Sequence, residues 1–370
     1  MDNSVKAFLA LVQSGLWENV VHLSSFENID FGKVYRLADE QTVTGLVAAG
    51  VEHVRDIVIP KEALLSLVGN TLQLEQRNLA MNSFIAKLIL KLQEVGVYAL
   101  LVKGQGIAQS YERPLWRACG DVDLLLSDDN YVKAAQVLAP LASKVDEEDV
   151  GRKHLALTIA PWVVELHGSL KTNLWKCLDQ LLQDVQNDIF YNGNVRSWVN
   201  GNIRVFLPGV NEDIVFVFSH ILQHFFVEGI GLRQICDWCR LLYKYKEEVD
   251  IELLKKHLKT ARIISEWRVF AMLSVKYLGM PEDAMPLYES STCLKRKAKR
   301  ALMMILDTGN FGHNRDMSYK QKNAFIVRLA KSFARRNKDA FQQILVFPVD
   351  GFRMWWKMVV LGVSVVAKGK

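Results

Sequence analysis

The stretch that decides the fold is LLVKGQGIAQSYERPLWRACGDVDLLL, residues 100–126. It begins and ends with short apolar runs bounded by glycine, which is typical of buried strands. Because side chains alternate along a strand, Asp121 and Asp123 are predicted to leave the same face of the second run. Two carboxylates so close together repel each other, and burying them is costly unless a cation lies between them. A pair of divalent metal ions about 3.5–4 Å apart is the usual cation for such a site.

The hydrophobic period changes from helical to extended around this stretch. The order of the expected elements is strand, helix, strand, helix and then two strands turned at Ala160-Pro161: 97–102, 105–111, 120–126, 129–141, 154–159 and 162–166. This order predicts a small mixed sheet within residues 96–168.

Helical patterns surround the predicted sheet. Apolar residues recur at intervals of three and four in one long segment after Pro60, which predicts a helix that ends near Glu94. Shorter helical patterns cover residues 5–16, 31–49, 211–226, 232–245, 251–277, 292–306 and 321–335. The predicted class is α+β, with a core at 96–205 between a helical region at 1–95 and another at 206–345, followed by an apolar terminal helix at 346–370.

Composition and cysteine content indicate a globular protein of a reducing compartment. Half of the 370 residues are hydrophobic and 23% are charged, which is ordinary for such a protein. The N-terminal segment lacks the pattern of a signal peptide, and five cysteines are too few and odd in number for a disulfide framework. We therefore expect a cytoplasmic location.

Charge is distributed unevenly along the chain. Residues 253–370 contain 23 Lys and Arg and 8 Asp and Glu, net +15, which leaves net −9 for residues 1–252. Basic runs at 294–300 and 334–338 indicate either solvated helix faces or a surface for a polyanion such as RNA. The apolar stretch 352–367 is interrupted by two basic residues and is too short to span a bilayer. It predicts a docked terminal helix, with membrane contact through Trp355 and Trp356 as the alternative.

A third acidic residue, Glu165, lies in the apolar segment WVVELHG, residues 162–168. On a strand it shares a face with His167, and an acid in such a segment needs a partner. If this strand lies beside the strand that carries Asp121 and Asp123, the three carboxylates form one cluster.

These motifs together resemble an uncharacterised nucleotidyltransferase family of the polymerase-beta-like nucleotidyltransferase superfamily. The matching pieces are LVKGQGIA, Tyr111, Pro114, Arg117, GDVDLLL and VELH, followed by FVFSHILQHF and GIGLRQICDW with His220, His224, Gly229, Arg233 and Asp237. The resemblance covers roughly residues 75–245. It implies a small mixed-sheet nucleotidyltransferase core that transfers a nucleotide from an NTP to a hydroxyl of unknown identity on a protein, an RNA or a small molecule.

The resemblance also implies roles for individual residues. Asp121, Asp123 and Glu165 would be the catalytic residues and would bind Mg²⁺ or Mn²⁺. The expected nucleotide-binding residues are Lys103, Gly104, Gln105, Arg117 and Gly120, and the expected supporting residues are His167, His224, Arg233 and Asp237. The superfamily's usual Gly-Gly or Gly-Ser turn is replaced here by Lys103-Gly104-Gln105-Gly106, so the phosphate contacts differ from the usual pattern.

Structural interpretations of the same residues remain open. The two aspartates would then cap a buried strand, Glu165 would pair with an arginine such as Arg117, and Lys103 would form an ion pair. The corresponding functional alternatives are a binding or scaffold protein that keeps the fold without activity, and a transferase directed to RNA.

A zinc site is a further alternative for two later helices. His220 and His224 are four residues apart, and Cys236 and Cys239 are three apart, a spacing compatible with Cys₂His₂ ligation. The resemblance explains the histidines and Asp237 without the cysteines, which also fit the apolar face of their helix as small hydrophobic residues.

Overall fold

The computed structural model describes residues 1–312, 314 and 325–367. One mixed sheet of seven strands carries the core and has the order β3-β4-β5-β2-β1-β7-β6. The strand bounds, in chain order, are β1 (Ala99–Val102), β2 (Asp121–Leu126), β3 (Lys144–Val145), β4 (His154–Ile159), β5 (Trp162–His167), β6 (Val195–Asn200) and β7 (Ile203–Pro208). The predicted α+β class, a mixed sheet flanked by helices, is confirmed.

The centre of the sheet combines parallel and antiparallel pairs. Strand β2 is antiparallel to β1 and parallel to β5, and β1 is parallel to β7. The hairpin β4–β5 adjoins this centre at one edge and the hairpin β6–β7 at the other. Strand β3 extends the sheet beyond β4. The first of them turns at a cis Ala160-Pro161 peptide, where the sequence predicts the turn.

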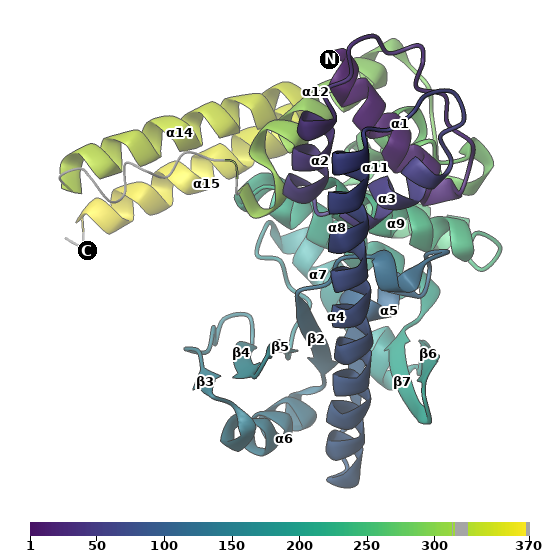
Figure 1. Ribbon diagram of the computed structural model, residues 1–370. Coiled ribbons are helices and arrows are strands. Elements are labelled where there is room, and N and C mark those ends of the chain that lie inside the picture. Colours follow the sequence, from purple (N-terminus) through teal and green to yellow (C-terminus); the bar gives the residue numbers. More distant parts are fainter. Residues whose placement is uncertain (313, 315–324, 368–370) are drawn as a thin grey trace.

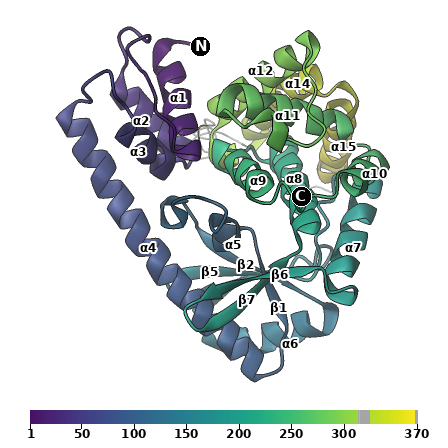
Figure 2. The ribbon, with the colours of Figure 1, turned by 90° about the vertical axis from the view of Figure 1, so that its right-hand side faces the viewer.

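The N-terminal helices are α1 (Asn3–Trp17), α2 (Phe31–Glu40), α3 (Thr44–Glu52) and α4 (Lys61–Glu94). The predicted long helix after Pro60 is therefore confirmed as α4. It runs from the N-terminal helices along one flank of the sheet (Figure 2). Its apolar side packs on the face of the sheet from which Val122, Leu124, Val164 and Leu166 project, all at most 1% exposed.

The helices that connect the strands are α5 (Gly104–Ala108), η1 (Pro114–Trp116), α6 (Asp128–Leu138), η2 (Ala139–Leu141) and α7 (Lys176–Tyr191). Helix α6 lies on the same side of the sheet as α4 and shares its apolar cluster. Leu100, Val102 and Leu125 project from the opposite face into the larger core, to which α7 also contributes. The two faces of the sheet therefore pack into two separate apolar clusters.

The C-terminal helices cover the remaining side of the larger core: α8 (Val210–Val227), α9 (Leu232–Lys244), α10 (Ile251–Thr260), α11 (Ile264–Leu278), η3 (Glu282–Ala284), α12 (Thr292–Thr308), η4 (Asn310–Gly312), α14 (Phe325–Val346) and α15 (Pro348–Ala367). Helices α14 and α15 pack against each other and project from the body as an arm (Figure 1). None of the described helices combines the length and apolar character needed to cross a membrane.

Several predicted elements differ from the structure. A single helix over 251–277 is wrong, because the chain breaks between α10 and α11, where Arg262 adopts a left-handed conformation with φ 61°. Strands β3, β6 and β7 and helix α7 are not in the sequence prediction. The expected helix 321–335 is observed from Phe325, and its first four residues lie outside the described part of the chain.

Candidate functional site

The three predicted acidic residues converge at one end of β2 and β5. Asp123 lies directly opposite Glu165 in the parallel pair, and Asp121 is two residues earlier on the same face of β2. One carboxylate oxygen from each of the three residues lies within 4.8 Å of the others. Alternation along the strands places these acids on one face and the buried apolar residues on the other.

Lys103 lies between β1 and α5 and points into this cluster. Its Nζ lies 2.8 Å from Asp123 Oδ1, so the structure favours the ion-pair alternative for this lysine. Its backbone is in a region that L-residues rarely adopt, with φ 57° and ψ −146°. Such a conformation costs on the order of 1–3 kcal/mol and is concentrated at functional sites. The next residue, Gly104, also has a positive φ, and a Cβ there would lie 3.2 Å from Cys119 Sγ.

Two histidines flank the cluster on the side of β4. His167 Nε2 lies 2.8 Å from Asp123 Oδ1 and 3.5 Å from Glu165 Oε2. His154 Nε2 lies 3.1 Å from the same oxygen of Glu165. The expected supporting position of His167 is consistent with these contacts. His154 is absent from the prediction, although the predicted turn at Ala160-Pro161 already sets it opposite His167.

The acids differ in their electrostatic environments. Repulsion by Asp123 and burial raise the pKa of Asp121, for which no ion pair is found among the described residues. Burial opposes ionisation of Asp123, but the positive charge of Lys103 and the hydrogen bond with His167 outweigh it and lower its pKa. Burial also opposes ionisation of Glu165, whose hydrogen bonds with His154 and His167 hold its pKa well below the ordinary value. Two acids are thus kept ionised, whereas at Asp121 the charges of Lys103 and Arg233 do not outweigh the repulsion by Asp123 and burial.

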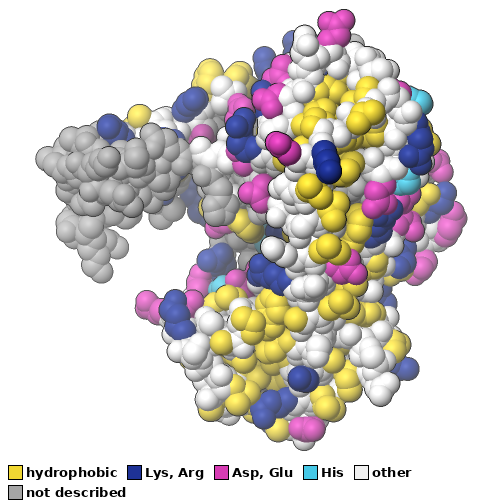
Figure 3. Space-filling view, viewed as in Figure 1, with side chains coloured by type: hydrophobic (Ala, Val, Ile, Leu, Met, Phe, Trp, Pro, Cys, Tyr) yellow, Lys and Arg dark blue, Asp and Glu magenta, His cyan; other side chains and the backbone are white. Residues whose placement is uncertain are grey.

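A pocket of about 490 Å³ opens beside the acids, between the sheet and helices α8 and α9. Its wall includes Lys103, Gly104, Ile107, Arg117, Asp121, Asp123, Val217, His220, Arg233, Gln234, Asp237 and Phe311. In the space-filling view, acidic, basic and histidine side chains lie close together in a hollow above the part of the molecule that holds β3, β4 and β5 in Figure 1 (Figure 3).

A buried ion pair lines this pocket. Arg117 donates through Nε and Nη2 to the two carboxylate oxygens of Asp237, at 3.0 and 2.6 Å, and both side chains are 5% exposed. Tyr111 donates its hydroxyl to the same carboxylate at 2.8 Å. The interpretation of Arg117 as a partner of Glu165 is wrong, because Asp237 takes that place.

Two buried arginine nitrogens at the pocket lack hydrogen-bond partners among the described residues. They are Nη1 of Arg117 and Nε of Arg233. Arg233 donates through Nη1 to the Ala118 carbonyl at 2.8 Å, and its pKa is lowered by burial and by the charge of Arg117. Positive groups therefore face the acids across the pocket.

Three other residues predicted for the site are Gln105, Gly120 and His224. Gln105 is 1% exposed and donates to Asn78 Oδ1 at 2.8 Å, so its side chain is directed towards α4 and is not among the residues of the pocket wall. The expected contact between this side chain and a nucleotide does not fit that placement. At Gly120 a Cβ would meet nothing within 4 Å, so the backbone there is open. On α8, His224 contacts His220 Nε2 at 2.9 Å, and it contacts Glu228, which follows the helix, at 3.1 Å.

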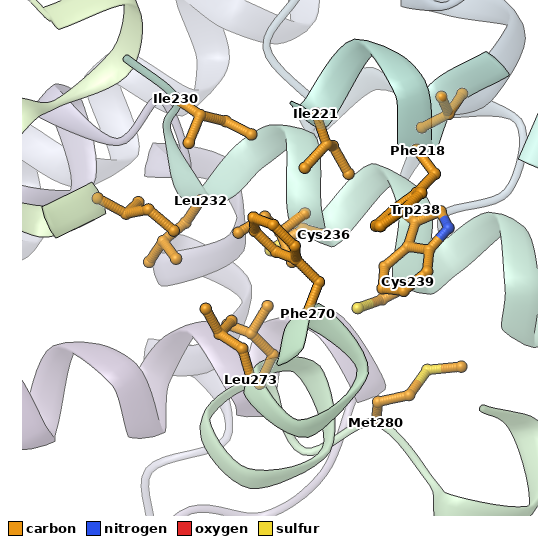
Figure 4. Close-up of a cluster of buried hydrophobic side chains, with 14 of the residues drawn as sticks. Phe218, Ile221, Ile230, Leu232, Cys236, Trp238, Cys239, Phe270, Leu273 and Met280 are labelled. Carbon is orange, nitrogen blue, oxygen red and sulfur yellow. The ribbon is translucent and has the colours of Figure 1, made fainter. Parts of the chain in front are cut away.

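The cysteines of the alternative zinc site lie away from the histidines. Cys236 and Cys239 are 0% exposed and lie in the apolar core among Phe218, Trp238 and Phe270 (Figure 4). Burial raises the pKa of Cys239 to about 12, which opposes the thiolate form that zinc requires. Neither cysteine belongs to a group of potential metal ligands within the described residues. The structure favours the interpretation of both as hydrophobic residues.

The carboxylate oxygens of the acid cluster are suitable ligands for a divalent cation. Carboxylate oxygens are the ligands that Mg²⁺ prefers, and a cation would relieve the repulsion between Asp121 and Asp123. The ion pair of Lys103 with Asp123 is the competing interaction. The ion pair of Lys103 is with Asp123. The oxygens of Asp121 and Glu165 can therefore bind a metal ion while Lys103 stays in place.

A mixed sheet with three convergent carboxylates, placed beside a pocket with basic groups, is the class of arrangement found in metal-dependent transferases. The chain matches the model of an uncharacterised nucleotidyltransferase family over residues 27–278. This match covers more than half of the chain, and the protein belongs to that family. No curated protein and no solved structure matches the chain.

Proposed function

We propose that the protein is a metal-dependent nucleotidyltransferase that moves a nucleotide from an NTP to a hydroxyl acceptor. The observation that carries this proposal is the meeting of three carboxylates, with one oxygen of each within 4.8 Å of the others, beside a pocket that Asp121 and Asp123 line. Membership of a nucleotidyltransferase family supports the class of reaction.

The acids have distinct roles in this proposal. Asp121, Asp123 and Glu165 would hold Mg²⁺ or Mn²⁺, which would neutralise charge on the triphosphate and polarise its α-phosphate. The acceptor oxygen forms a bond to the α-phosphorus as the bond to the β-phosphate oxygen breaks and pyrophosphate leaves. Glu165, kept ionised by its two histidines, would hold the ion that lowers the pKa of the acceptor hydroxyl, and the hydroxyl proton passes to water.

The basic groups of the pocket bind the triphosphate. Lys103 pairs with Asp123, and with a cation held by that carboxylate its ammonium group would be available to pair with phosphate oxygens. Arg117 and Arg233 offer the two unpartnered nitrogens described above, while the rest of the Arg117 guanidinium remains bound to Asp237. The open backbone at Gly120 and the turn at Gly104 allow close approach of phosphate.

The test is transfer of label from α-³²P NTPs, each supplied with Mg²⁺ or Mn²⁺ and with a cell extract separated into RNA, protein and small molecules. We expect release of pyrophosphate and labelling of one fraction by the wild type, and loss of both in D121N/D123N. The control variant E147Q changes an exposed acid outside the cluster and should retain activity. NTP binding without transfer in every fraction would identify a binding or scaffold protein and overturn the proposal of activity.

A polyanionic acceptor such as RNA is the second candidate. Most of the basic side chains in the runs at 294–300 and 334–338 are exposed on α12 and α14. An RNA acceptor predicts that the RNA fraction carries the label and that transfer falls steeply as salt rises. Labelling of protein or small molecules with little salt dependence would contradict this candidate. We propose the cytoplasm as the location in either case.

A further inference from the structure

His154, Glu165 and His167 form a second group of potential metal ligands next to the carboxylate cluster. One donor atom of each lies within 4.8 Å of the others. Both histidine Nε2 atoms approach the same oxygen of Glu165, at 3.1 and 3.5 Å. The group comes from two adjacent strands, because His154 on β4 lies directly opposite His167 on β5.

The distances from Glu165 Oε2 to the two histidine Nε2 atoms, 3.1 and 3.5 Å, match those between neighbouring ligands of a tetrahedral metal ion. With metal–ligand bonds of about 2.0–2.1 Å, neighbouring donor atoms are separated by about 3.3 Å. The three side chains are between 17% and 29% exposed, so an ion can reach them and a water or substrate oxygen can occupy a further position.

The chemistry of the donors differs from that of the carboxylate cluster. Two imidazole nitrogens and one carboxylate oxygen suit Zn²⁺ and other first-row transition ions, whereas Mg²⁺ prefers oxygen ligands. We propose that His154, Glu165 and His167 form a transition-metal position beside the carboxylate position. Glu165 belongs to both groups of ligands, so the two positions are adjacent and linked through one side chain.

The proposal deepens the proposed function, because it specifies a nitrogen-ligated ion at the same site. The transition-metal position does not depend on nucleotidyl transfer, however, because its ligands do not include Asp121. A preference of activity for a transition ion over Mg²⁺ is the functional consequence when both proposals hold.

The test is calorimetric titration of the untagged, metal-stripped full chain with Zn²⁺ and, separately, with Mg²⁺. We expect the wild type to bind Zn²⁺, H154Q to bind it at least tenfold more weakly, and D121N to bind it as the wild type does. H22Q removes a well-exposed histidine outside the site and should leave Zn²⁺ binding unchanged. Far-UV circular dichroism during heating checks that each variant is folded.

Cobalt absorption provides a second measurement. Co²⁺ bound by the two histidines should give visible bands in the wild type and D121N, and these bands should be lost in H154Q. Equal Zn²⁺ affinity and equal Co²⁺ spectra in the wild type and H154Q would overturn the proposal. Failure of the proposed function is distinguishable, since it appears as absence of Mg²⁺ and NTP binding while Zn²⁺ binding persists.

Discussion

Asp123 on β2 and Glu165 on β5 lie directly opposite each other in parallel strands, and both contact the same nitrogen of His167. The Asp123 side chain is 2% exposed, so its repulsion of other carboxylates is poorly screened, whereas Glu165 is 26% exposed and accessible to a cation. The sheet therefore fixes the spacing of the carboxylates by backbone hydrogen bonds before any ligand binds. This is the kind of rigid support that a metal site requires.

The ion pair between Lys103 and Asp123 should restrain metal binding in the absence of nucleotide. K103M removes the ammonium that competes for Asp123, so we expect Mg²⁺ affinity to rise about tenfold, or ~1.4 kcal/mol. We expect NTP affinity to fall by a similar factor, because a charge-assisted phosphate contact is lost. Calorimetry of each ligand measures both effects. K91M, on the exposed side of α4, is the control, and two unchanged affinities in K103M would contradict this role of Lys103.

The Arg117–Asp237 pair should be important for stability. D237A leaves a buried guanidinium and the Tyr111 hydroxyl without their acceptor, so we expect a loss of about 3–5 kcal/mol in the free energy of unfolding. Urea denaturation measures this loss. E252A removes an exposed partner of Lys255 and should cost less than about 1 kcal/mol. Similar small effects in both variants would show that Asp237 is not the structural partner of Arg117.

Stability should fall as pH rises because of Glu266, a buried acid on α11. Burial and the neighbouring carboxylate of Asp350 raise the pKa of Glu266 to about 8. Between pH 4.5 and 8 the folded protein retains a proton that the unfolded chain releases, so this group's contribution to stability falls through that window and is constant above it. The slope should reach at most about 1.4 kcal/mol per pH unit.

Urea denaturation at several pH values checks the Glu266 prediction. E266Q should remove this part of the pH dependence, whereas E62Q, which changes an exposed acid on α4, should retain it. Identical pH profiles in the wild type and E266Q would contradict the assignment.

The sequence predicts the acid cluster because the positions of the three acids follow from the alternation of side chains along each strand and from one hairpin. The motif around Asp121 and Asp123 and the turn at Ala160-Pro161 suffice to place the acids on strands. The same turn fixes the register that sets His154 opposite His167, so this histidine was predictable as well. The hairpin β6–β7 also had a local signal, since Gly201-Asn202 is a typical two-residue turn between extended segments.

The long-range contacts could not be predicted in this way. Arg117 and Asp237 are 120 residues apart, and their pairing depends on how α9 packs against the loop before β2. The hydrogen bond of Gln105 with Asn78 likewise depends on the packing of α4, which directs the glutamine away from the pocket. Hydrophobic periodicity predicts which face of a helix or strand is buried, but it does not predict which elements pack against each other.

The central claim is that Asp121, Asp123 and Glu165 together hold a divalent ion and, with it, a triphosphate. The most direct measurement is calorimetric titration of an NTP with a non-hydrolysable α–β linkage, in the presence and absence of Mg²⁺. We expect Mg²⁺-dependent binding by the wild type and E147Q, and at least a tenfold loss in E165Q and D123N. Binding of equal strength in all four proteins, or no dependence on Mg²⁺ in the wild type, would contradict the claim.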